Sequence, residues 1–218
     1  RKGNFLFGAK APRKHLDGLL RKISIVILPF IVIFTYISGL KMFLLLALMI
    51  IVNLIYNFRP FRLKERPPFE ILIQVGYVLT AFFATELNGL DDLPWQTVVY
   101  LSLFAFQAHI AGEIMDIEPD IAAGKRTTAS ILKRKWSKVL MLFLLLAESV
   151  LLWYWFEDLV LATFLGVFSI WLVLDVFVIF KNKPYSLSQM KLFGIAINIS
   201  ALLSMAWVLY SGKLLFVI

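Results

Sequence analysis

The chain has 218 residues with a mean hydropathy of +0.84, and 61% of them are hydrophobic while only 17% are charged. A soluble domain is closer to half apolar with about a quarter of its residues charged, so this composition excludes an ordinary water-soluble fold, and the absence of cysteine excludes disulfides and zinc–thiolate sites. We interpret the net charge of +8 as a topology signal and an attraction to anionic lipid, which gives no reason to invoke nucleic acid.

Apolar runs separated by short charged breaks predict an all-α, polytopic membrane bundle. Most runs approach the roughly 20 apolar residues needed to cross a bilayer core, and lipid offers no partner to a bare backbone, so each run should be helical. The turn SGLK joins the first two runs as a hairpin. The seven expected spans lie near 24–40, 42–57, 71–87, 95–112, 139–156, 159–180 and 192–210.

The positive residues predict the orientation in the membrane. If the N-terminus is cytoplasmic, only Lys41 and Lys213 of the 22 Lys and Arg lie on the outer side. This positive-inside bias predicts a multi-pass protein of the plasma membrane, with its N-terminus inside and its C-terminus outside. The cytoplasmic segments are then 1–23, 58–70, 113–138 and 181–191.

The longest polar stretch, EIMDIEPDIAAGKRT, contains four carboxylates within eight positions. The residues of interest are His109, Glu113, Asp116 and Asp120. Their spacing of 4, 3 and 4 places them on one face of a helix that continues out of the fourth span, and Pro119 is expected to end that helix just before Asp120. Hard oxygen ligands in this arrangement suit Mg²⁺ together with a substrate phosphate, so Asp116 and Asp120 are candidate metal ligands. The alternative is a solvated acidic loop.

The preceding inside loop, YNFRPFRLKERPPFE, holds a second group of candidates. Arg62 and Lys64 alternate with apolar residues, so an extended segment would point both cations the same way, toward a phosphate. Tyr56 ends the second span beside them. Lys125 and Arg126 are further candidates for contacting phosphate. The positive-inside rule alone would explain all four cations; the nearby acidic loop favours phosphate binding for the first pair, whereas the rule remains the better explanation of the second.

Several polar residues lie within or near the apolar runs. His109 and Glu113 share the acidic face and are candidates for supporting the metal or the substrate indirectly, as is Asn53, which precedes the basic loop. Glu148 and Asp175 lie near mid-span without an obvious partner. We interpret those two as packing residues or as neutral, protonated acids.

The two loops resemble motifs of the UbiA superfamily of intramembrane prenyltransferases. DIEPDIAAGKRTTASIL, 116–132, is similar to the family's second aspartate-rich motif, and YNFRPFRLKERP, 56–67, is similar to its tyrosine–proline–lysine loop. The DIEPD and RLKERP sequences further resemble the branch that includes lycopene elongases. The resemblance implies a single membrane-embedded domain over 1–218, with seven helices of a nine-helix family fold.

The resemblance also implies the chemistry. Mg²⁺ would be held by Asp116 and Asp120, and the leaving diphosphate by Arg62 and Lys64, while a hydrophobic acceptor such as lycopene receives the prenyl group. The family's first aspartate motif is absent, and RKGNFLFG resembles the stretch that follows it. We therefore expect an N-terminally truncated chain, without the first two family helices, that binds prenyl diphosphate but does not transfer it measurably.

One alternative belongs to another functional class. A small transporter or a lipid-binding membrane protein would use the acidic face, with Glu148 and Asp175, as a path for cations or protons. Binding of prenyl diphosphate that depends on Mg²⁺ would separate the two interpretations.

Overall fold

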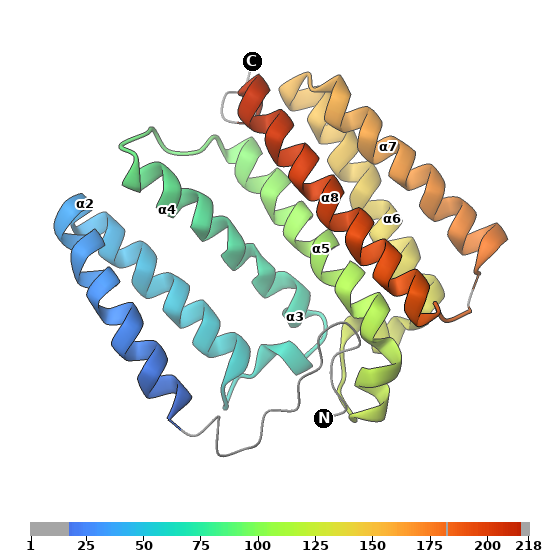
Figure 1. The fold of residues 1–218 in the computed structure, drawn as a ribbon, viewed down its shortest axis with the longest axis horizontal. Helices are drawn as coiled ribbons and strands as arrows, with labels where there is room; N and C mark the ends of the chain where they lie inside the picture. The colour runs from blue at the N-terminus through green and yellow to red at the C-terminus, as the bar shows by residue number, and fades with distance from the viewer. Residues whose placement is uncertain (1–17, 182, 215–218) are drawn as a thin grey trace.

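The computed structural model describes residues 18–181 and 183–214, and this part of the chain is all-α (Figure 1). The elements are α2 (Leu19–Asn57), η1 (Leu63–Glu65), α3 (Phe69–Leu72), η2 (Ile73–Val78), α4 (Leu79–Leu87), α5 (Trp95–Ala122), α6 (Thr128–Phe156), α7 (Leu159–Leu174), η3 (Asp175–Ile179) and α8 (Leu187–Ser211). Among the described residues, six helical segments are long and apolar enough to cross a membrane. The chain is therefore a multi-pass integral membrane protein, as the apolar runs predict.

The first two expected spans both fall within α2. The backbone leaves the helical conformation there at Gly39, with φ 78° and ψ −161°, a region that glycine enters without steric cost. Figure 1 shows α2 doubling back on itself at this point. Because only one residue departs from helical geometry, the structure has six membrane-length helices where the apolar runs predict seven spans.

The two helices of the acidic segment are longer than expected. Pro119 does not end α5, which continues to Ala122, so Asp120 lies inside the helix. A proline so close to the end removes only one hydrogen bond of the final turn, and the amide of Ala123 still closes that turn on the Pro119 carbonyl. Helix α6 begins at Thr128, ahead of the span expected over 139–156, because Thr127 and Ser130 form a capping box. Its backbone leaves the helical conformation once, at Lys133, with φ 62° and ψ 168°.

The interior is built mainly on the contact between α5 and α6. Ile110, Ile114 and Ile117 of α5 recur on one face and pack with Ala129 and Leu144 of α6. This packing fixes the direction in which the acidic face of α5 points.

A close approach also joins α2 to the segment that precedes α4. A Cβ at Gly76 would lie 2.5 Å from Cγ1 of Val52, so only glycine allows η2 to lie this near α2. The end of α2, with the basic loop that follows it, is thereby held beside the rest of the bundle.

The connections are distributed between the two ends of the bundle. The loop after α2 and the α5–α6 connection lie at one end, and the Gly39 turn and the α4–α5 connection lie at the other (Figure 1). At this second end, Lys41 Nζ forms ion pairs with Asp92 Oδ1 at 2.7 Å and with Glu86 Oε2 at 2.9 Å. The basic and acidic loops therefore share one membrane face, as expected.

Candidate active site

A cavity of about 380 Å³ lies where the end of α2 and η1 meet the last turns of α5 and the start of α6. We call it the acidic cavity. Seven of the predicted site residues line it: Tyr56, Lys64, His109, Glu113, Asp116, Asp120 and Lys125. The structure thus brings together side chains from two loops that the sequence keeps far apart.

The two candidate metal ligands are one helical turn apart on α5. Asp116 Oδ1 is buried and has no hydrogen-bond partner among the described residues. Asp120 is buried and forms an ion pair with Lys125 through its Oδ1, at 2.5 Å from Nζ. A desolvated carboxylate oxygen without a donor is unfavourable, so the Asp116 oxygen would gain from a cation placed in the cavity.

This donor set fits one Mg²⁺ ion. Within the described ranges, no group of three or more His, Cys, Asp or Glu side chains is arranged to hold a metal. Mg²⁺, however, usually keeps several waters and binds through one or two carboxylates plus substrate phosphates. Asp116 and Asp120 supply the carboxylates, and water and a diphosphate would complete the shell.

The two cations of the basic loop do not point the same way. Arg62 adopts a left-handed conformation with φ 44°, and residues Leu63–Glu65 form a short 3₁₀ helix, so the segment is not extended as expected. Arg62 instead pairs with Glu65, at 2.7 Å between Nη2 and Oε1, and lines a neighbouring cavity that shares Glu65 with the acidic cavity. Lys64 lines the acidic cavity and donates to Asn57 Oδ1 at 3.1 Å.

Two other candidates also lie outside the acidic cavity. Arg126 is exposed, beside the Asp120–Lys125 pair, and does not line the cavity. Asn53 donates to the Met49 carbonyl at 3.0 Å and lines a neighbouring cavity. Neither residue is within the group that surrounds Asp116.

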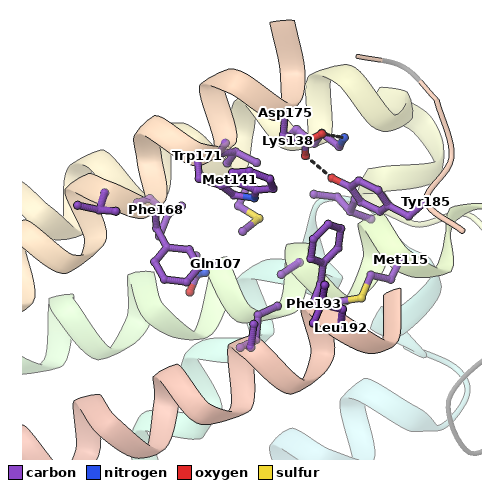
Figure 2. A pocket seen from close by; sticks show the side chains of 17 residues that line it. Gln107, Met115, Lys138, Met141, Phe168, Trp171, Asp175, Tyr185, Leu192 and Phe193 are labelled. Atoms are coloured by element: carbon purple, nitrogen blue, oxygen red, sulfur yellow. Dashed lines mark hydrogen bonds and ion pairs between the residues drawn. The ribbon is translucent and has the colours of Figure 1, made fainter. Parts of the chain in front are cut away.

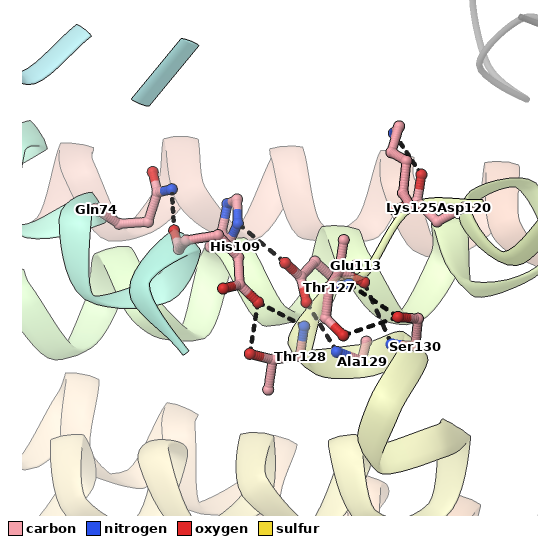
Figure 3. Close-up of polar contacts among 10 residues, drawn as sticks. Gln74, His109, Glu113, Asp120, Lys125, Thr127, Thr128, Ala129 and Ser130 are labelled. Carbon is pink, nitrogen blue, oxygen red and sulfur yellow. Dashed lines mark hydrogen bonds and ion pairs between the residues drawn. The ribbon is translucent and has the colours of Figure 1, made fainter. Parts of the chain in front are cut away.

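Glu113 and His109 are held by each other and by the start of α6. Glu113 Oε1 lies 3.2 Å from His109 Nε2, and its Oε2 accepts a hydrogen bond from the Ala129 amide at 2.9 Å (Figure 3). Sequence reasoning missed Glu70, whose Oε1 accepts hydrogen bonds from both the amide and the hydroxyl of Thr128. The one signal for it was an isolated acid at the start of an apolar run.

Comparison with known proteins identifies the family. A model of the UbiA prenyltransferase family matches residues 18–197. The chain belongs to the UbiA prenyltransferase family. Members transfer prenyl groups from prenyl diphosphates to lipophilic acceptors and generally depend on Mg²⁺. No curated protein and no solved structure matches the chain, and the family match does not distinguish the lycopene elongase branch.

A UbiA protein acts on substrates with long apolar chains, so the cavities next to the acidic cavity matter for binding them. Tyr56 also lines a cavity of about 320 Å³ against α2, and His109 also lines one of about 440 Å³ between α4 and α5. Those two cavities share Gln74 and Tyr77 as walls. The three spaces therefore adjoin one another, and together they run from the loops toward the apolar part of the bundle.

A larger, mostly apolar cavity of about 500 Å³ lies between α5, α6, α7 and α8 (Figure 2). Gln107 and Met115 line it from α5, whereas the acidic cavity is lined from the same helix by His109 and Asp116. By the periodicity of a helix these two pairs project from different sides of α5, and no residue lines both cavities. The acidic cavity of this UbiA chain therefore does not open into the larger one.

Two partners of Asp175, for which the sequence offers no obvious one, lie at one end of the larger cavity. Lys138 Nζ lies 2.8 Å from Asp175 Oδ1, and the Tyr185 hydroxyl donates to Oδ2 (Figure 2). Burial, and then the hydrogen bond to Asp175, raise the pKa of Tyr185 far above its usual value. Glu148, by contrast, is fully buried and neither of its oxygens has a hydrogen-bond partner in the described part of the chain.

Proposed function

We propose that this chain binds a prenyl diphosphate with Mg²⁺ in the acidic cavity, as the first step of prenyl transfer to a lipophilic acceptor. The observation that carries the proposal is the juxtaposition of Asp116 and Asp120 with Lys64 in one cavity. Carboxylates for a metal and an ammonium group for phosphate are the two kinds of contact that a bound diphosphate requires.

Different residues of the acidic cavity would bind the metal ion and the diphosphate. Asp116 and Asp120 would hold the metal ion, which neutralises charge that develops on the diphosphate as it leaves. Lys64 would donate to diphosphate oxygens from the opposite wall, and Lys125 would do so from beside Asp120. Arg62 and Arg126 lie outside the cavity, and we propose that they add positive potential near its opening.

The transfer step follows from this arrangement. The bond between the prenyl C1 and the diphosphate oxygen breaks, and its electron pair leaves with the diphosphate. The allylic cation forms a new bond with an electron pair of the acceptor, which then loses a proton. The rings of Tyr56 and His109, whose centroids lie 6.4 Å apart, stand where the cavity continues toward α4, and an aromatic face there would stabilise the cation.

The apolar cavities beside α4 would hold the isoprenoid tail. They adjoin the acidic cavity at Tyr56 and His109, so a chain attached to a diphosphate in one space can extend into the next. Asn53 lines this path and would face the tail or the acceptor.

The acceptor and the topology are finer proposals. The DIEPD and RLKERP sequences support a carotenoid such as lycopene as the acceptor, which competition against a quinone-ring precursor would test. We further propose that each arm of α2 crosses the membrane separately, which gives seven crossings. With the N-terminus and both motif loops in the cytoplasm, Lys and Arg then lie on the side that the positive-inside rule requires.

Direct binding tests the function. The chain, purified into lipid nanodiscs, is titrated with a labelled prenyl diphosphate in Mg²⁺ and in EDTA, and transfer to an added acceptor is followed in the same samples. We expect saturable binding that EDTA abolishes, whether or not transfer is detected in the same samples. Binding that is equally tight in EDTA, or no binding in Mg²⁺, would rule out the proposal and favour the transporter alternative.

A further inference from the structure

The first three amide groups of α6 are all satisfied by side chains. The Thr128 amide donates to Glu70 Oε1 at 2.5 Å, and the Ala129 amide donates to Glu113 Oε2 at 2.9 Å. The Ser130 amide donates to Thr127 Oγ1 at 3.2 Å. Figure 3 shows the contacts of Glu113 and Thr127 converging on this end of the helix. Amide groups at a helix start have no partners within the helix, so here three side chains supply them.

The two carboxylates involved are shielded from water. Glu70 is 0% exposed and Glu113 is 7% exposed. A buried carboxylate is costly unless hydrogen bonds compensate it. Residues 128–132 form a single helical turn before the break at Lys133, so the compensation comes from the local amide and hydroxyl groups of this turn. Glu70 also accepts from the Thr128 hydroxyl at 2.5 Å, so its Oε1 receives two hydrogen bonds. Its Oε2 is buried and has no hydrogen-bond partner among the described residues, so the contacts with Thr128 hold this carboxyl group.

The same two carboxylates connect three separate parts of the acidic cavity. Glu70 lies in α3, directly after the basic loop that carries Lys64. Glu113 lies in α5, three residues before Asp116 and therefore on a neighbouring part of the same helix face. Both bind the start of α6, so the basic loop and the aspartate-bearing helix are tied to one common point.

The N-terminus of α6 is consequently not available to the substrate. A helix start is ordinarily a good site for phosphate, because its amides point outward and its dipole favours negative charge. Here Glu70 and Glu113 already occupy that position, and a diphosphate placed beside them would meet two carboxylates. These two acids therefore have a role other than metal or phosphate binding.

We propose that Glu70 and Glu113 are positioning residues, which hold Lys64 at a fixed distance from Asp116 and Asp120 by fastening both walls of the acidic cavity to the start of α6. The inference rests on the proposed function, since a fixed separation matters only if the two walls bind one diphosphate. A displacement of about 1 Å at such a site is enough to cost about 100-fold in reaction rate.

The distance between the two walls can be measured directly. The chain has no cysteine, so two introduced cysteines carry spin labels without further changes. Phe61 in the basic loop and Ile121 at the end of α5 are 53% and 58% exposed, which suits them for labelling. We expect a narrow distance distribution in the parent chain and in Glu70→Gln, because the amide oxygen still accepts from Thr128, and a broad distribution in Glu70→Ala.

Affinity for prenyl diphosphate is the second readout. In Mg²⁺, Glu70→Ala and Glu113→Ala should each weaken binding about 10- to 100-fold, the usual effect of removing a group that orients ligands. The two Gln variants should bind within about threefold of the parent, since each keeps an acceptor for the helix amide.

Asp158 offers a matched control for simple loss of stability. It is 2% exposed and caps α7 through the amides of Val160 and Leu161 at 3.1 and 3.0 Å, at the other end of the bundle. Asp158→Ala should lower the thermal midpoint as much as Glu70→Ala does, but it should leave affinity and the label distance unchanged.

The outcomes separate this inference from the proposed function. If Asp158→Ala and Glu70→Ala reduce affinity equally, or if the label distance is the same in every variant, Glu70 and Glu113 only stabilise the fold and the inference is wrong. If the parent chain binds no prenyl diphosphate, the proposed function fails, whereas the label distances still show whether these carboxylates hold the two walls together.

Discussion

Lys138 and Asp175 form an ion pair of 2.8 Å in which the two side chains are 0% and 3% exposed. The pair joins α6 to the π-helical turn η3, and the ring of Tyr185 covers the ammonium group at 4.2 Å from its centroid. Neither charge reaches water, so each depends on the other for compensation.

Removing one member should therefore be worse than removing both. Asp175→Leu or Lys138→Met leaves a buried charge without its partner, and we expect either to destabilise the fold by about 3–5 kcal/mol. The double variant should lie much closer to the parent. Thermal unfolding in detergent measures all four chains, and a double variant that loses the sum of the two single losses would show that the residues act independently.

Glu148 should behave in the opposite way. Neither of its oxygens has a hydrogen-bond partner among the described residues, and the side chain is fully buried, so Glu148→Leu should raise stability by about 1–3 kcal/mol. Prenyl diphosphate affinity should stay unchanged. Loss of binding or of cation movement in this variant would instead support a transport path through the helix, with Glu148→Gln as the control that keeps the shape.

Asp116 and Asp120 should differ in their effect on stability, although we propose that both hold the metal ion. Asp116→Ala removes a buried, unpaired oxygen and should not lower the thermal midpoint, whereas Asp120→Ala strands Lys125 and should lower it slightly. Each substitution should reduce Mg²⁺-dependent binding of prenyl diphosphate at least about 100-fold, since each would remove a proposed ligand of the metal ion. Titration with prenyl diphosphate in the presence of Mg²⁺ measures this, and near-parent affinity in either variant would exclude a metal ligand there.

Lys64 and Arg62 should no longer be equivalent. Lys64→Ala removes an ammonium group from the acidic cavity and should weaken prenyl diphosphate binding about 10-fold or more, as expected for one charge-assisted hydrogen bond. Arg62→Ala removes a cation that does not line the acidic cavity and is paired with Glu65 at its wall, so its effect should be small and should vanish at high salt. Equal losses would mean that the loop moves when the substrate binds.

Local sequence patterns predicted which residues of α5 line the acidic cavity. They failed where the position of a side chain depends on a contact far along the chain or on an irregular backbone conformation. Helical periodicity placed His109, Glu113 and Asp116 together, because a helix fixes the direction of every side chain. The alternation in the basic loop failed at Arg62, where a positive φ turns the chain.

Long-range partners were beyond the reach of these patterns. The partner of Asp175 lies 37 residues earlier in the chain, and that of Glu70 lies 58 residues later, so no local spacing identifies either contact. Helix α5 was expected to stop at Pro119, but it continues to Ala122. A proline this close to the C-terminal end of a helix removes little, so the proline alone does not determine where the helix ends.

At the end of the bundle away from the acidic cavity, the ion pairs of Lys41 are exposed to water. Lys41 is 54% exposed and its partner Asp92 is 69% exposed, so water and salt compete with this contact and it contributes little to stability. At the end that carries the acidic cavity, the corresponding fastening is the buried set of carboxylate–amide hydrogen bonds at the start of α6. The α2 hairpin is thus joined to the α4–α5 connection by exposed contacts, whereas its other end adjoins buried ones. We therefore expect changes in bilayer thickness or in salt to loosen the contact at the Gly39 end of α2 before they affect the residues around Asp116.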